Sequence, residues 1–104
     1  MKRFKVRIIS AVEDAIRGAF YYIHERSPQN AAAWLRGLYQ AIETLETMPA
    51  RCSLIREQAA FDEEVRELLH HAHRIIFTIH DDDALVLVHA FRHSAQDDLQ
   101  PPED

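Results

Sequence analysis

The sequence has few residues of the kinds on which several common protein classes depend. It contains two glycines, Gly18 and Gly37, and one cysteine, Cys52, among 104 residues. Phosphate-binding loops and the turn that presents a catalytic serine need glycines where the backbone approaches its ligand, and both glycines fall inside segments with the pattern of helices. This scarcity excludes Walker-type, dinucleotide-binding and serine-elbow motifs.

The single cysteine also excludes an internal disulfide and a metal cluster built on thiolates. No apolar run approaches the ~18 residues that span a bilayer. Glu13 and Asp14 interrupt the apolar stretch after the basic N-terminus, so we expect no signal peptide. The expectation is a cytoplasmic protein in a reducing compartment, without membrane contact.

Charge is divided unevenly along the chain, whose formal net charge is −5. Residues 1–61 hold nine Lys and Arg against six Asp and Glu, whereas residues 62–104 hold three against eleven. Nucleic-acid binding draws on many contacts between cations and phosphates, which the acidic half opposes. The distribution favours protein partners over direct, sequence-specific binding of nucleic acid.

The N-terminal part alternates first with the period of a strand and then with that of a helix. Apolar and charged residues alternate over residues 4–9, which predicts a half-buried strand. Ser10, with Glu13 three residues later, has the form of a capping box at a helix start. Apolar residues then recur at three- and four-residue spacing, which predicts a helix that ends near Arg26.

A second helix follows a clear break at Ser27 and Pro28. Proline disfavours helix at the residue before it but suits the first turn of a new helix, which Ser27 can cap. The apolar pattern continues to Met48. Because the link is so short, the two helices are expected to pack antiparallel as a hairpin.

The aromatic residues of this hairpin are interpreted as packing residues rather than as binding platforms. Trp34 and Leu38 are expected near the core, and Tyr21 and Tyr22 are expected to support helix packing.

The C-terminal half has the pattern of a three-stranded antiparallel meander. Strands are predicted over residues 65–70, 73–80 and 84–91, after a long loop over 50–64. With the N-terminal strand joined to this sheet and the hairpin covering its apolar face, the fold class is α+β. We expect one domain over residues 1–95 and an acidic, frayed tail over 96–104.

Histidines are concentrated near the end of the chain, with five between His70 and His89. His71 and His73 would share one face of a continuous strand and could together bind a metal. No His-x-x-x-His pattern or cysteine pair supports such a site. We therefore expect no metal and no cofactor.

Two arginines stand at strand ends. Arg74 begins an otherwise apolar strand, and Arg92, followed by His93, ends the last strand, where a side chain can reach a phosphate or a carboxylate. Alternatively each arginine is paired with a nearby acid, such as Glu67 or Asp97. Both interpretations remain open at this point.

The order and spacing of these segments resemble the RelE/ParE superfamily of small bacterial toxins across nearly the whole chain. The resemblance is carried by the segments AFYYIHERSPQNAAAWL, AIETLETMPAR, VREL, HRIIFTI and DDDALVLVHAFRH. It implies a twisted antiparallel sheet packed on a helix hairpin. It also implies a cytoplasmic bacterial protein that binds a cognate antitoxin in a hetero-oligomer and is silenced by it.

This superfamily has two broad activities. RelE-like members cleave mRNA at the ribosome with clustered basic residues and often a tyrosine near the C-terminus, whereas ParE-like members poison DNA gyrase. Arg74 matches the strand arginine of the ribonuclease pattern, but residues 67–73 contain no Lys or Arg. The basic residues that often follow the last strand are replaced by the sequence after His93, and no tyrosine lies beyond Tyr39.

The resemblance therefore favours a ParE-like gyrase inhibitor, with Arg74, Arg92 and His93 as expected partner-binding residues. One alternative is a ribosome-dependent endonuclease in which Arg74 steadies a phosphate and His73 or His93 is the acid–base group. Another is a degenerate member that only binds its antitoxin.

Overall fold

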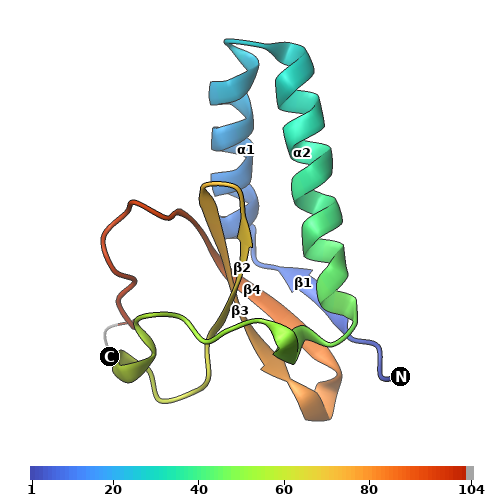
Figure 1. Cartoon of the computed structure of the whole chain (residues 1–104), viewed down its shortest axis with the longest axis vertical. Helices are drawn as coiled ribbons and strands as arrows, with labels where there is room; N and C mark the ends of the chain where they lie inside the picture. Colours follow the sequence, from blue (N-terminus) through green and yellow to red (C-terminus); the bar gives the residue numbers. More distant parts are fainter. Residues whose placement is uncertain (103–104) are drawn as a thin grey trace.

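The computed structural model describes residues 1–102 as a four-stranded sheet with a helix hairpin rising from it (Figure 1). The elements in chain order are β1 (Lys5–Ile8), α1 (Ser10–His24), α2 (Pro28–Glu43), β2 (Arg66–His70), β3 (His73–His80) and β4 (Leu85–His93). Short 3-10 turns occupy the connections, at Thr44–Glu46, Pro49–Arg51, Gln58–Ala60 and Asp81–Asp83. The predicted α+β class and the order of its elements are confirmed.

The sheet has the order β1-β4-β3-β2. Strands β2, β3 and β4 form the expected antiparallel meander, whereas β1 lies parallel to β4 at the sheet edge, with Val6 opposite Val86. The sheet is therefore mixed rather than wholly antiparallel. A parallel pair needs a long crossover, which the hairpin and the meander together supply.

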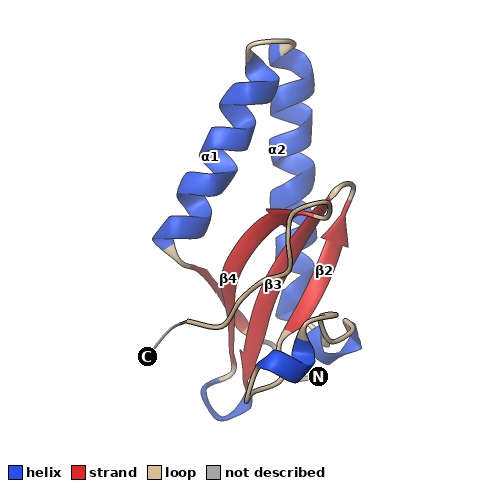
Figure 2. Ribbon diagram, turned by 90° about the vertical axis from the view of Figure 1, so that its left-hand side faces the viewer, coloured by secondary structure: helices blue, strands red, loops and turns tan. Residues whose placement is uncertain are grey.

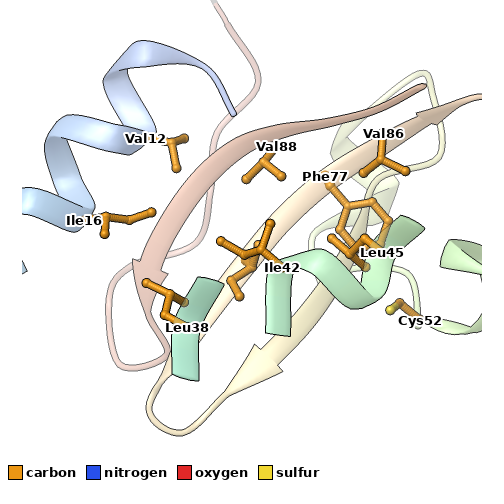
Figure 3. Packing of buried hydrophobic residues seen from close by; sticks show 10 residues of the cluster. Val12, Ile16, Leu38, Ile42, Leu45, Cys52, Phe77, Val86 and Val88 are labelled. Carbon is orange, nitrogen blue, oxygen red and sulfur yellow. The ribbon is translucent and has the colours of Figure 1, made fainter. Parts of the chain in front are cut away.

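The main core lies between the sheet and the halves of the helices nearest to it (Figure 3). Its buried side chains include Val12, Ile16, Leu38, Ile42, Leu45, Phe77, Val86 and Val88. Trp34 packs against this cluster half-buried, as expected for a residue near the core. The tip of the hairpin extends past the sheet, so only the part of each helix that is nearer to the sheet packs on it (Figure 1).

A smaller cluster lies on the opposite face of β3 and β4. Its buried members Ile55, Val65 and Ile76 come from the long loop and β3, and Leu99 from the C-terminal segment packs against them. Side chains alternate between the faces of a strand, so Ile76 belongs to this cluster while Phe77 belongs to the main core. The loop and the C-terminal segment thus form a second cover for the sheet (Figure 2).

Residues 96–102 of the expected tail lie against the domain, and the flexibility of this tail stays a prediction. Asp98 accepts a hydrogen bond from Arg56 at 2.9 Å, and Leu99 is half-buried in the smaller cluster. Among the acidic residues that suggested a solvated tail, Asp98 is paired with Arg56, while the Asp97 and Asp98 side chains both stay exposed. The last two residues of that expected tail lie outside the described residues.

The two helices begin differently. The Ser27 hydroxyl accepts a hydrogen bond from the Asn30 amide at 3.3 Å, and Pro28 is the first residue of α2, as predicted. The expected capping box at Ser10 is wrong, because Ile9 occupies the cap position and no side chain caps α1. The Ile9 amide donates to the Val88 carbonyl at 3.3 Å, so pairing with β4 continues to the last residue of the predicted strand, directly before the helix.

The remaining boundaries differ by small amounts from the expected ones. Helix α2 ends at Glu43 and tightens into a 3-10 turn, well before Met48. The long loop contains two single 3-10 turns, and β4 continues to His93. Within residues 1–102, no helix has both the length and the apolarity needed to cross a membrane.

The difference between the two helix starts can be measured with a matched pair of variants. Ser27→Ala should lower the free energy of unfolding by about 1 kcal/mol, since it removes the only side-chain acceptor at the start of α2. Ser10→Ala should change it by less than about 0.5 kcal/mol, because this hydroxyl caps nothing. Urea unfolding checks both, and equal losses would contradict the assigned caps.

Candidate functional site

Arg74, at the start of β3, lies inside the protein rather than on its surface. Its Nη1 and Nη2 atoms donate to the two carboxylate oxygens of Glu57 at 2.9 and 2.6 Å, and its Nε donates to Glu67 Oε1 at 2.7 Å. The side chains of Arg74 and Glu57 are both 3% exposed. The guanidinium is therefore neutralised by carboxylates on two sides.

The ion pair determines the charge state of Glu57. Hydrogen bonds from Arg74 outweigh the effect of burial and lower the pKa of Glu57 to about 2. The same pairing raises the pKa of Arg74 above its usual value. Arg74 thus differs from the expected accessible side chain, and a phosphate could reach it only by displacing Glu57. Its role in partner binding stays a prediction.

Arg92 lies opposite Arg74 in the β3–β4 register. It is half-buried, and its Nη2 donates to the backbone carbonyl of Asp97 at 2.7 Å. The expected proximity to Asp97 is present, but the acceptor is the main chain rather than the carboxylate. Arg92 is a cation whose buried Nε–H group has no acceptor among the described residues.

His73 and His93 form an aromatic cluster on the other face of the same strand ends. The His73 ring stacks on Phe91 with centroids 4.5 Å apart, and Trp34 meets both rings edge-on at 6.1 Å. His93 lies edge-on to His73 at 5.4 Å. Burial, with smaller contributions from His93 and His70, lowers the pKa of His73, which therefore favours its neutral form.

The residues singled out from the sequence thus divide between two faces of the sheet. His73 and His93 face the helix hairpin through Trp34, whereas Arg74 and Arg92 face the loop and the C-terminal segment. No single group of acid, base and phosphate-binding cation is formed by them. Within residues 1–102, no three His, Cys, Asp or Glu side chains are placed to hold a metal ion.

A groove between the two helices was not recognised from the sequence. A cavity of about 200 Å³ is lined by Glu13, Ile16, Arg17, Phe20, Tyr21, Leu35 and Tyr39. Tyr21 is 58% exposed and Tyr22 is 61% exposed, so neither is the packing residue that was expected. Their position near the projecting hairpin tip explains this difference, since no strand lies there to cover them.

The contribution of the buried ion pair to stability can be tested by replacing one carboxylate oxygen of Glu57 with an amide nitrogen. Glu57→Gln should lower the free energy of unfolding at pH 7 by about 3 kcal/mol, because Arg74 would remain buried with an incomplete partner. Glu46→Gln is the matched control. It alters an exposed pair with Arg3 at 3.1 Å and should cost less than about 1 kcal/mol.

The same comparison has a defined pH dependence. Because the pKa of Glu57 is about 2 in the folded chain against an ordinary 4.5, its stabilising effect is complete above about pH 4.5. It is lost as the pH falls through the folded value. The difference in free energy of unfolding between the wild-type chain and Glu57→Gln should therefore become smaller in acid. A difference that does not change with pH would contradict the low pKa of Glu57.

Comparisons with known proteins agree with this fold. Residues 6–98 match the family described as the ParE toxin of the type II toxin–antitoxin system, parDE. No curated protein matches the sequence. The fold is similar to a chain in the crystal structure of the toxin–antitoxin complex RelBE2 from Mycobacterium tuberculosis. The TM-score is 0.57 at 21% identity, over 92% of this chain and 97% of that chain. Because the family match extends over most of the sequence, the chain belongs to the ParE toxins of type II toxin–antitoxin systems.

Proposed function

We propose that this protein inhibits DNA gyrase by protein–protein contact and is neutralised by a cognate antitoxin. The observation that carries the proposal is the match to the ParE toxin family over residues 6–98. The acidic net charge is consistent with contacts to protein rather than to nucleic acid.

The geometry disfavours the alternative of an mRNA endonuclease. Metal-free cleavage of RNA requires an acid–base group and several cations that converge on one phosphate. Arg74 is occupied by Glu57 and Glu67, and His73 lies on the opposite face of the strand. An endonuclease would need a large rearrangement of these side chains before it could act.

Arg92 and His93 are the accessible members of the proposed partner-binding set. His93 is exposed and Arg92 is half-exposed at the end of β4. Arg74 would contribute from beneath, because its pair with Glu57 fixes the strand end on which Arg92 lies. This end of the sheet is the surface that we assign to the target.

A supercoiling assay tests the proposed target directly. Purified toxin should block supercoiling of relaxed plasmid by purified gyrase, and Arg92→Gln should weaken this inhibition at least about tenfold. Arg17→Gln, which alters an exposed pair with Asp14 on α1, is the matched control and should leave the inhibition unchanged. Undiminished supercoiling at saturating toxin would contradict the proposal.

Expression without the antitoxin separates the alternatives. Pulse labelling measures DNA synthesis and protein synthesis after expression begins. If DNA synthesis stops before protein synthesis, the result agrees with gyrase inhibition. Arrest of protein synthesis first would favour the endonuclease, and unimpaired growth would favour a chain that only binds its antitoxin.

The groove between α1 and α2 is our proposed docking site for part of the antitoxin. It offers apolar and aromatic side chains from both helices together with charged residues at its rim, which suits one face of an amphipathic helix. An extended segment of the antitoxin would continue along the sheet edge. The solved RelBE2 structure is itself a toxin–antitoxin complex, which is consistent with such a partner.

Two neighbouring tyrosines provide a test of this docking site. Tyr21→Ser should raise the dissociation constant of the antitoxin complex at least about tenfold, because it removes an exposed aromatic side chain from the groove. Tyr22→Ser should change it less than about twofold, since Tyr22 lies outside the groove against Arg26. Calorimetry with the purified antitoxin measures both values, and equal effects would argue against the groove.

A further inference from the structure

The C-terminal segment is held against the sheet in the manner of a bound peptide. Residues 96–102 contribute no helix or strand, yet they contact the domain through the Asp98 carboxylate, two backbone carbonyls and the Leu99 amide. Figure 2 shows the segment crossing β3 and β4 on the face away from the hairpin. The contacts therefore describe what kind of peptide this face can bind.

Cations hold the acidic part of the segment. Arg56 donates from Nε to Asp98 Oδ1 at 2.9 Å and from Nη2 to the Gln96 carbonyl at 3.2 Å. Arg92 donates from Nη2 to the Asp97 carbonyl at 2.7 Å. Two guanidinium groups thus face two consecutive acidic residues, although only one of the carboxylates is engaged.

An apolar pocket receives the next residue. Leu99 packs on the cluster of Ile55, Val65 and Ile76, and its amide donates to Glu57 Oε2 at 2.8 Å. Glu57 is itself fixed by Arg74, so the acceptor for this amide is rigidly placed. A cavity of about 360 Å³ adjoins Leu99 and has a mainly apolar lining that includes Phe61, Ile76 and Pro102.

The segment uses this site incompletely. Arg92 keeps a buried Nε without a partner among residues 1–102, because a single carbonyl oxygen occupies only its Nη2. A carboxylate could accept from both atoms in the bidentate arrangement that arginine favours. The Arg56–Asp98 pair is largely exposed, at 48% and 63%, and such pairs contribute little to stability. A separate peptide could therefore form better contacts than the chain's own segment.

We propose that Arg56, Arg92, Glu57 and the apolar cluster under Leu99 form a binding site for an acidic peptide with an aliphatic anchor residue. Residues 97–99 occupy this site within the same chain and limit access to it. A partner segment with one or two carboxylates directly before a leucine-like side chain would replace them. The proposed site shares Arg92 with the surface assigned to gyrase, but its test uses peptide binding alone, and none of its residues lines the groove between the helices.

The test uses the full chain with its own segment released. The double variant Asp98→Lys, Leu99→Ser loses both the ion pair and the apolar anchor. A fluorescent peptide with the sequence of residues 96–102, QDDLQPP, is then titrated into the wild-type chain and the released variant. Anisotropy should give at least a tenfold higher affinity for the released variant, because the wild-type site is already filled.

Specificity is tested in the released variant. Adding Arg56→Gln should weaken binding of the peptide at least fivefold, whereas Arg36→Gln, at an exposed position of α2 on the other side of the sheet, should not. A peptide with serine in place of leucine should lose most of its binding. Circular dichroism and the melting temperature show whether each variant is folded.

Other outcomes would overturn the proposal. Equal affinity of the wild-type chain and the released variant would mean that the segment does not occupy the site. If neither Arg56→Gln nor the replacement of leucine in the peptide lowers its affinity, the peptide binds elsewhere. If the folded released variant binds no peptide, or if wild-type chains form dimers by exchanging this segment, the site does not serve a separate partner. In the wild-type chain, excess peptide should also speed hydrogen exchange at the Leu99 amide, which a purely structural segment would not show.

Discussion

The buried guanidinium of Arg74 joins the loop, two strands and, through Glu57, the C-terminal segment. It lies on β3, pairs with Glu67 on β2 and binds both oxygens of Glu57 from the long loop. Glu57 in turn accepts the amide of Leu99 from the C-terminal segment. Because a buried charge without partners is very unfavourable, these four regions must assemble together around one cation. The cover on this face of the sheet depends on that assembly.

The sequence predicted the regular elements well because their apolar residues recur with clear periods. The hairpin, the meander and the cap at Ser27 follow from local pattern alone. The capping box at Ser10 failed because pairing of Ile9 with β4, a contact remote in sequence, decided where the helix begins. The parallel direction of β1 was likewise set by the whole crossover and not by its own residues.

The candidate site was predicted less completely. Neighbours in sequence such as His73 and Arg74 suggest one site, but the alternation of a strand places them on opposite faces, which the period of two already implies. Glu67 was named as a possible partner of Arg74 and does accept from it, but the second partner, Glu57, was missed because it lies in a loop without a period. The exposure of Tyr21 depended on how far the hairpin extends past the sheet, which helix periodicity does not reveal.

The parallel pairing of β1 with β4 also orders events during synthesis. Of the four strands of the sheet, β1 is synthesised first and pairs with β4, which is synthesised last, so Lys5 cannot meet Leu85 until the other two strands have been made. Contacts between such distant parts of a chain form late and slow the folding of a domain. Until β4 emerges, β1 has no strand to pair with, and the hairpin lacks the part of its core that Val86 and Val88 supply. The surfaces of this domain are therefore not complete until β4 has been translated.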